Sequence, residues 1–293
     1  MFRHDGNEVH NAPGKSRPMQ IVADAIGDEL GKPINVTNRI GADGLVGAQS
    51  VLQEKPDGYT VFVSVSTIMI VPLFLGQEEP LDPEQFKYIG SFMADERVLY
   101  AQTDAPYKTF EEFISYAKEH PGELTYGGCN RWATSIMKSI AVKEGLDLKY
   151  VFFEGGAPAA AAILGGHIDV CELGLGGNPA YQSVEAGKLR ILVNFSSKNV
   201  PEYPNVQNVK ALGYPFEIQN YYGFLLHAET PEYIREMWEN ALRKVMQDPN
   251  LINKMKNLGM NPSFVDGQEW EEVCKGIVPK AQDLLEYIKV LEE

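Results

Sequence analysis

Cysteine is scarce in this chain, which has three cysteines in 293 residues. Cys129, Cys171 and Cys274 lie far apart, with no C-x-x-C pair and no histidine at the spacing typical of metal ligands. The sequence therefore indicates neither a disulfide scaffold nor a structural zinc site. We expect no metal and no cofactor.

Basic charge is also in short supply. The chain has 26 lysine and arginine residues against 40 aspartate and glutamate residues, which gives a formal net charge of −14 at pH 7. Because such a chain repels a phosphate backbone, we expect no nucleic-acid partner. An anionic ligand would have to be held by a locally positive site.

Long apolar runs are missing as well. A membrane-spanning helix needs roughly 18 apolar residues, whereas the longest apolar stretch, residues 68–75, is interrupted by Pro72 and predicts a buried segment. The polar residues 1–6 lack the apolar core of a signal peptide. The protein is therefore either cytoplasmic or begins after an export signal that was removed, and composition leaves both open.

Strand-like and helix-like segments alternate along most of the chain. The alternation predicts an α/β fold with largely parallel sheets, in two domains or one large one. Periodicity and turn signals predict helices at 19–31, 45–54, 110–119, 133–144, 155–164, 178–186, 231–247, 249–258 and 267–291, and strands at 34–37, 59–65, 88–92, 97–101, 124–126, 150–153, 168–172 and 188–195.

Gly14, Lys15 and Ser16 resemble the end of a phosphate-binding P-loop. That motif needs a glycine five residues before Gly14, and the chain has Val9 there. We therefore expect an ordinary loop. Lys15 and Arg17 nevertheless stand just before a predicted helix, a position from which they could hold an anion.

Cys129 follows a predicted strand and precedes a predicted helix, where the helix dipole would activate a nucleophile. The five histidines form no recognisable constellation with it. A structural cysteine is the favoured interpretation. An enzyme that uses Cys129 as its nucleophile stays open as the alternative.

Short loops rich in Gly, Ser and Asn join a strand to a helix at residues 64–67, 126–134 and 173–179. Backbone N–H groups at helix starts attract anions without any net positive charge on the protein. This pattern suits a small carboxylate, and because no catalytic group converges on the loops, it favours binding over turnover. Aromatic residues at loop or crossover positions, such as Trp132 and Tyr221, fit core packing first and the walls of a cleft second.

Short motifs also occur in a fixed order from about residue 12 to the end. They are Ala12-Pro13-Gly14, residues 38–48 (NRIGADGLVGA), residues 56–60 (PDGYT), residues 120–126 (HPGELTY), residues 154–158 (EGGAP), residues 164–169 (LGGHID), residues 186–190 (AGKLR), and residues 222–226 (YGFLL) before Thr230-Pro231. Together they resemble the extracytoplasmic solute receptors of tripartite tricarboxylate transporters, the Bug family.

The resemblance implies the fold of a type II periplasmic binding protein, with two α/β lobes and a ligand cleft between them. Receptors of this family typically capture small carboxylates and deliver them to membrane permease subunits, so the implied location is periplasmic or otherwise extracytoplasmic, and we expect a monomer. The implied boundaries are residues 1–101 and 223–293 for lobe one and 102–222 for lobe two, and the implied ligand loops are 13–20, 64–68, 127–135 and 173–178.

Several loops depart from the family pattern. Lys15 and Arg17 stand where relatives have glycine and an acidic residue, Arg131 stands in a loop that relatives fill with glycine and serine, and the apolar first strand of the family is not legible in residues 1–12. We infer that charge-assisted pairing, above all from Arg131, replaces part of the backbone cradle. Side chains that point into solvent are the alternative. Trp132 could then select an aromatic or elongated ligand by stacking.

The expected function is thus capture of a small carboxylate by lobe closure for a tripartite tricarboxylate-type transporter. The alternatives are the enzyme with Cys129 as nucleophile and a ligand sensor of the same fold that is not coupled to transport. We expect no catalytic residues, and we expect these ligand-binding residues: Lys15, Ser16, Arg17, Ser66, Thr67, Gly128, Cys129, Asn130, Arg131, Trp132, Thr134, Gly174, Gly176, Asn178 and Tyr221.

Overall fold

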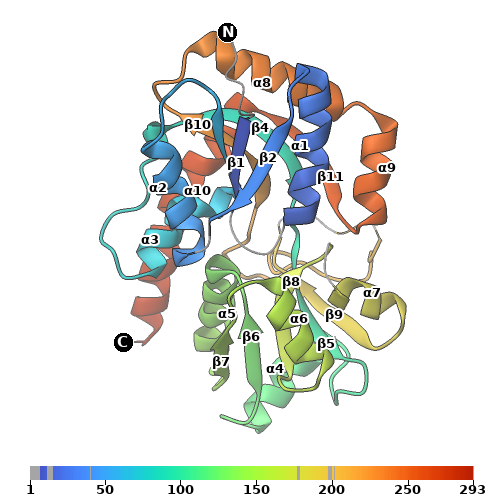
Figure 1. Ribbon diagram of the computed structural model, residues 1–293. Helices are drawn as coiled ribbons and strands as arrows, with labels where there is room; N and C mark the ends of the chain where they lie inside the picture. Colours follow the sequence, from blue (N-terminus) through green and yellow to red (C-terminus); the bar gives the residue numbers. More distant parts are fainter. Residues whose placement is uncertain are drawn as a thin grey trace. The chain divides into compact units, whose positions relative to one another are not determined.

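A computed structural model describes residues 7–11, 16–39, 41–176, 179–196, 200 and 202–292, with the backbone alone at 7–11, 16–18 and 292 (Figure 1). The chain packs into two units. Unit 1 comprises the described residues up to Ala94 together with Asn220–Val278, and unit 2 comprises Asp95–Gln219 together with the described residues from Pro279 on.

Unit 1 is built on a mixed six-stranded sheet. Its strands are β1 (Asn7–Asn11), β2 (Ile34–Asn38), β3 (Thr60–Val65), β4 (Phe86–Ala94), β10 (Tyr221–His227) and β11 (Asn261–Asp266). They lie in the order β11-β4-β10-β3-β1-β2. β1 pairs in parallel with β2 and β3, whereas β10 is antiparallel to β3 and β4, and β11 is antiparallel to β4.

Helices cover both faces of this sheet. They are α1 (Ser16–Leu30), α2 (Leu45–Leu52), α3 (Val71–Phe74), α8 (Glu232–Val245), α9 (Pro249–Asn257) and the start of α10 (Gly267–Glu292), with short 3₁₀ turns η1 (Ala42–Gly44), η2 (Ser66–Ile70) and η3 (Pro83–Gln85). Because side chains alternate along a strand, Val61 and Val63 of β3 join the core that includes Val22 of α1 and Trp238 of α8, while Phe62 faces α2.

Unit 2 has its own mixed sheet of five strands. They are β5 (Arg97–Gln102), β6 (Thr125–Gly128), β7 (Lys149–Phe152), β8 (Val170–Gly174) and β9 (Leu189–Asn194), in the order β7-β6-β8-β5-β9. β6 is parallel to β7 and β8, and β5 is antiparallel to β8 and β9. The helices of this unit are α4 (Phe110–Glu119), α5 (Arg131–Glu144), α6 (Gly156–Leu164), α7 (Pro179–Glu185) and the end of α10.

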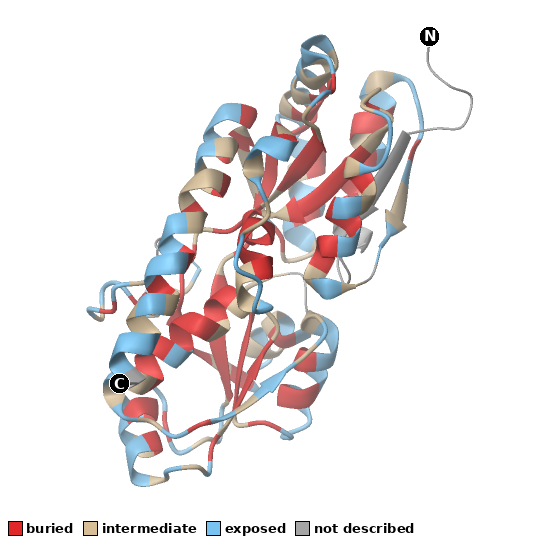
Figure 2. Cartoon of the chain, turned by 90° about the vertical axis from the view of Figure 1, so that its left-hand side faces the viewer, coloured by how far each residue is buried: buried red, intermediate tan, exposed pale blue. Residues whose placement is uncertain are grey.

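Buried residues concentrate on the strands of each sheet (Figure 2). In unit 2 the core joins Tyr100 of β5, Ile163 of α6 and Cys171 of β8. Each unit thus has a core of its own, as the α/β pattern of the sequence predicts. Among the residues that the structure describes, no helix combines the length and the apolar composition that crossing a bilayer requires.

The α/β class is confirmed, and α4 spans the predicted residues 110–119. Most strands of each sheet run in one direction, as expected, but β5, β10 and β11 run against their neighbours, so both sheets are mixed. β5 and β10 follow the points where the chain passes from one unit to the other. Their antiparallel pairing therefore reflects a change of unit that periodicity does not report.

Three further expectations are corrected. A first strand, not legible in residues 1–12, is present as β1 at Asn7–Asn11. The expected breaks after residues 101 and 222 fall after Ala94 and Gln219 instead, because β5 forms hydrogen bonds with β8 and β9 and so belongs to unit 2. The residues from Pro279 on also belong to unit 2 and not to the first lobe.

Candidate functional site

The carboxyl ends of parallel strands are the usual place for a ligand in an α/β sheet. In unit 1, β3 ends at Val65, and β10 begins beside it, with Tyr222 opposite Val65. The short turn η2 follows β3 directly. The predicted residues Ser66, Thr67 and Tyr221 therefore lie together at one edge of this sheet.

Ser66 serves the packing of unit 1 at this edge. Its Oγ accepts hydrogen bonds from the backbone N–H of Tyr221 and from Nε1 of Trp270, each at 3.2 Å, and the side chain is fully buried. Thr67 is also buried. The hydroxyl of Ser66 thus ties the start of β10 to α10.

The remaining predicted residues of unit 1 stand at the start of α1. Ser16 and Arg17 belong to its first turn, and only their backbone is described. Lys15 lies outside the described residues, as does Asn178 of unit 2.

In unit 2 the corresponding edge is formed by the ends of β6 and β8 and the start of β5. β6 ends at Gly128, and Arg97, the first residue of β5, pairs with Gly174 at the end of β8. A Cβ on Gly128 would lie 2.3 Å from Oγ1 of Thr134, and a Cβ on Gly174 would lie 2.7 Å from Oδ1 of Asp95. A side chain at either glycine would thus force a neighbouring side chain to move, so packing alone favours glycine at both positions.

A buried ion cluster, consisting of Asp95, Arg97 and Glu172, lies beneath this edge. Nε of Arg97 pairs with Oε1 of Glu172, and Nη1 of Arg97 lies 3.3 Å from Oδ2 of Asp95. Glu172 is completely buried, and the other two are almost so. Burial raises the pKa of the Glu172 carboxyl, and the Arg97 guanidinium opposes that rise.

The same carboxylate reaches the start of α5. Oε2 of Glu172 accepts hydrogen bonds from the backbone N–H groups of Cys129 at 3.4 Å and Asn130 at 3.2 Å. Asn130 is the N-cap of α5, and its side chain accepts from the N–H of Ala133 at 3.0 Å. These three N–H groups are thus engaged within unit 2.

Cys129 is half-buried next to the ion cluster. Its Sγ lies 3.1 Å from Nη2 of Arg97 and 3.7 Å from the carbonyl oxygen of Glu172. The cation and the carbonyl orient the thiol, but neither is the general base that a catalytic cysteine uses.

Arg131 and Trp132 begin α5 and differ in their surroundings. The Trp132 side chain is buried, and its Nε1 donates to the carbonyl oxygen of Glu217 at 3.2 Å. The buried ring therefore contributes to packing, and its proposed stacking on a ligand stays a prediction. The guanidinium of Arg131 lies over the Phe152 ring, 4.5 Å from its centroid, at the end of the neighbouring strand β7.

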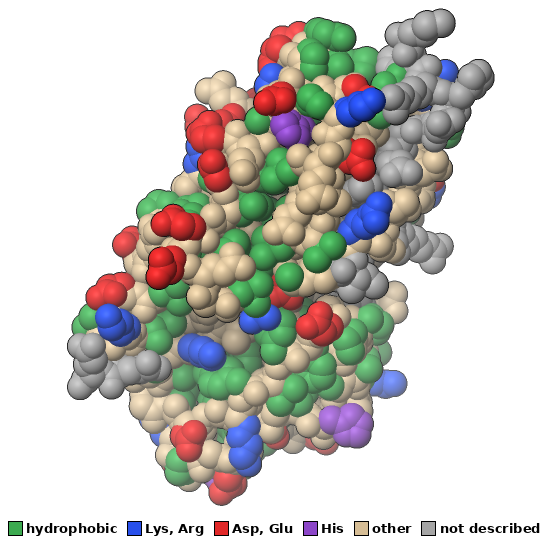
Figure 3. All heavy atoms as spheres, turned by 60° about the vertical axis from the view of Figure 1, so that its left-hand side comes forward, with side chains coloured by type: hydrophobic (Ala, Val, Ile, Leu, Met, Phe, Trp, Pro, Cys, Tyr) green, Lys and Arg blue, Asp and Glu red, His purple; other side chains and the backbone are tan. Residues whose placement is uncertain are grey.

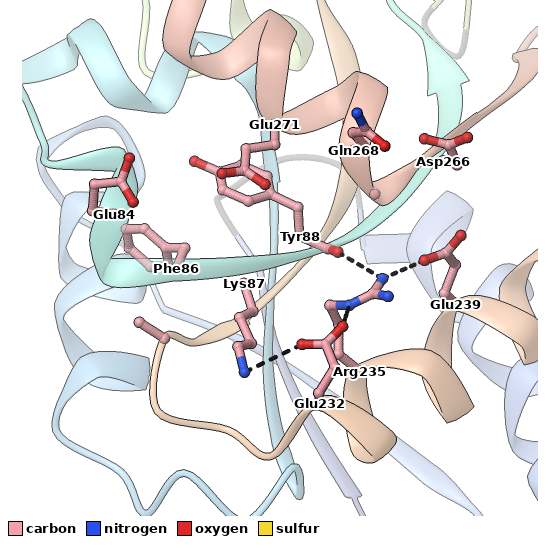
Figure 4. Close-up of a pocket in the computed structure, with 12 residues that line it drawn as sticks. Glu84, Phe86, Lys87, Tyr88, Glu232, Arg235, Glu239, Asp266, Gln268 and Glu271 are labelled. Carbon is pink, nitrogen blue, oxygen red and sulfur yellow. Dashed lines mark hydrogen bonds and ion pairs between the residues drawn. The ribbon is translucent and has the colours of Figure 1, made fainter.

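Unit 1 also has a pocket of about 600 Å³ away from these strand ends. Figure 4 shows it between the start of β4, α8 and the start of α10. Phe86 of β4 pairs with His227, at the sheet edge opposite the Val65–Tyr222 pair. Within unit 1 the pocket therefore lies at the other end of β10 from Ser66, Thr67 and Tyr221.

The pocket is lined by charges that pair with one another (Figure 4). Arg235 binds Glu232 and Glu239, and Lys87 lies 3.3 Å from Glu232. Hydrogen bonding to Arg235 lowers the pKa of Glu232. We interpret this lining as a solvated ion-pair network of unit 1, because Glu232 and Glu239 already have cationic partners.

Sequence reasoning missed Asp95, Arg97 and Glu172. The signal was present: each strand that holds Arg97 or Glu172 is otherwise almost wholly apolar, and a charge in such a strand has to be paired when buried. Among the described residues, no group of three or more His, Cys, Asp and Glu side chains is arranged to hold a metal ion. On the face displayed in Figure 3, lysine and arginine side chains are scattered and form no continuous patch.

Comparison with known proteins gives consistent results. The chain is 29% identical over 273 residues to the UPF0065 protein in the gbd 5′ region of Cupriavidus necator, an alignment that covers 92% of this chain and 82% of that protein. A solved periplasmic transporter structure is 25% identical, with a TM-score of 0.84 over 97% of this chain and 98% of that one.

Two structures from Rhodopseudomonas palustris share the fold. MatC with bound malate is 22% identical, with a TM-score of 0.77 over 99% of each chain. Rpa4515 with adipate is 18% identical, with a TM-score of 0.83 over 98% of this chain and 99% of the other. The family described as the tripartite tricarboxylate transporter family receptor matches residues 19–290, so the chain belongs to this family of solute-binding receptors.

Proposed function

We propose that the protein is an extracytoplasmic receptor that captures a small carboxylate and delivers it to the permease of a tripartite tricarboxylate transporter. The observation that carries the proposal is the family match over residues 19–290. The ligands named for two proteins of the same fold, malate and adipate, support a carboxylate.

The proposed ligand groups are the predicted residues at the strand-end edges described above and the predicted residues around the start of α1. Lys15 and Arg17 precede or begin α1, and Arg131 begins α5. Because the chain has a net charge of −14, an anion is bound only where such cations and helix starts gather. Arg131 is the best candidate for a direct, bidentate contact with a carboxylate, since the Phe152 ring already supports its planar guanidinium.

We further propose that the receptor acts as a monomer in the periplasm or an equivalent compartment. The ligand favours the closed form of the two lobes, and the closed form docks on the permease. The half-buried Cys129 belongs to the binding edge in this proposal and does no chemistry.

Two measurements test the proposal. Mass spectrometry of the small molecule released when the purified protein is denatured identifies the ligand, and a molecule without a carboxylate would contradict the proposal. Calorimetry then compares the wild type with Arg131→Ala. Loss of one charge-assisted hydrogen bond weakens binding by about 2 kcal/mol, or roughly thirtyfold in Kd.

Arg243→Ala is the matched control. The Arg243 guanidinium also lies over an aromatic ring, 4.8 Å from the centroid of Phe264, but it belongs to α8 in unit 1 and pairs with Glu239 at 2.6 Å. We expect this variant to bind the ligand as the wild type does. Equal affinities of all three proteins would show that Arg131 makes no contact with the carboxylate.

A further inference from the structure

Two N–H groups just before α5, those of Cys129 and of the N-cap residue Asn130, already bind a carboxylate, that of Glu172 in the same chain. Oε2 of Glu172 accepts from the N–H groups of Cys129 and Asn130, while Oε1 pairs with Arg97. N–H groups at a helix start, aided by the helix dipole, favour one negative charge. Glu172 supplies that charge from β8, the strand next to β6.

The Glu172 carboxylate that occupies these N–H groups is buried and paired with a cation. Glu172 is fully buried, and its cationic partner Arg97 is 5% exposed. Nη1 of Arg97 also lies 3.3 Å from Asp95, so the cluster has two acids and one cation. An incoming carboxylate at this point would meet two acidic side chains that already share one cation, and it would have to break a buried ion pair to reach the two N–H groups.

Arg131 lies on the other side of the β6 end. The strand order β7-β6-β8 puts Phe152, and with it the Arg131 guanidinium, beside β7, whereas Glu172 belongs to β8. The edge of unit 2 therefore has the Arg131 cation on one flank and, on the other, two N–H groups that Glu172 already occupies. One ligand carboxylate fits this arrangement, and a second one beside β8 does not.

We propose that Glu172 is a specificity-determining residue: by filling the amide site at the start of α5, it makes the receptor prefer ligands with one carboxylate over dicarboxylates of the same length. This inference rests on the proposed carboxylate-receptor function. The structures of two proteins of the same fold contain the dicarboxylates malate and adipate, so dicarboxylates are the natural comparison.

The first test needs no knowledge of the ligand. Glu172→Ala empties the site and leaves Arg97 and the two N–H groups to bind formate. We expect about 100 mM sodium formate, relative to equal sodium chloride, to raise the melting temperature of this variant by about 3 °C more than that of the wild type. Glu172→Ser, which also removes the carboxyl group and vacates its space but keeps a polar side chain, is measured in parallel in case the alanine variant does not fold.

Glu112→Ala is the matched control in the same unit. Oε2 of Glu112 also accepts a backbone N–H, that of Lys108 at 2.6 Å, but this bond is exposed to solvent. We expect the control to respond to formate as the wild type does. A formate response of both Glu172 variants no larger than that of the wild type would overturn the inference.

The second test measures selectivity by calorimetry with butyrate against succinate and hexanoate against adipate. The wild type should bind the monocarboxylate of each pair at least about tenfold more tightly, and Glu172→Ala should reduce that ratio about tenfold. A wild type that prefers the dicarboxylates, or a ratio unchanged by the substitution, overturns the inference and leaves the receptor function standing. If no carboxylate binds and the released ligand contains none, both the proposed carboxylate-receptor function and the proposed preference for monocarboxylates are wrong.

Discussion

Removing the cation of the buried cluster should destabilise unit 2 severely. Arg97→Met keeps most of the side-chain volume but leaves Glu172 and Asp95 without their shared partner. Loss of one member of a buried ion pair costs about 3–5 kcal/mol. For domains of this size, each kcal/mol lowers the melting temperature by about 2–4 °C, so we expect a loss of about 10 °C at pH 8.

The loss should depend on pH in a defined direction. Burial raises the pKa of Glu172, and without Arg97 the opposing effect is gone, so the pKa rises further. A carboxyl whose pKa is raised by folding stabilises the folded state at low pH and loses that contribution as pH rises through the raised value. The deficit of Arg97→Met relative to the wild type should therefore shrink between pH 8 and pH 5.

Thermal unfolding followed by circular dichroism across this range provides the measurement. Lys118→Met is the control, because Lys118 forms a solvent-exposed pair with Glu144 at 2.8 Å and should change the melting temperature by less than about 2 °C. The double variant Arg97→Met with Glu172→Leu should recover part of the loss, since it removes the unpaired charge. A small deficit in Arg97→Met that is independent of pH would refute the account of the cluster.

Two other predictions concern the glycines at the strand ends and the reactivity of the three cysteines. Gly128→Ala should lower the free energy of unfolding by about 1–3 kcal/mol, because its Cβ would lie 2.3 Å from Oγ1 of Thr134. Gly156→Ala is the control, since the nearest atom to its Cβ is 3.7 Å away, and chemical denaturation should show almost no change for it. In the native protein, iodoacetamide should label Cys129 slowly and without protection by ligand, and the two buried cysteines should stay unlabelled until denaturant is added. Fast, ligand-protected labelling of Cys129 would favour the enzyme alternative.

Much of the architecture is readable in the linear order of residues. Periodicity and turn residues locate α4 at 110–119 and place α5 and β3 within about two residues, because local preferences and burial agree in these segments. β1 is not readable, because its residues Asn7–Asn11 are mostly polar and their pairing with β2 and β3 is a long-range event. The same holds for β5, whose membership of unit 2 depends on partners far along the chain.

The amino-acid sequence by itself determined the α/β class, the family resemblance and the loops at the strand ends. Only the tertiary structure decided which polar groups of those loops already have partners within the protein. Nε1 of Trp132 binds a backbone carbonyl, Ser66 links β10 to α10, and Glu172 binds N–H groups just before α5. The physical reason is that a hydrogen-bonding group is available to a ligand only if no group of the protein already satisfies it. Whether it is satisfied depends on residues such as Glu172, which lies more than 40 positions from Asn130 in sequence.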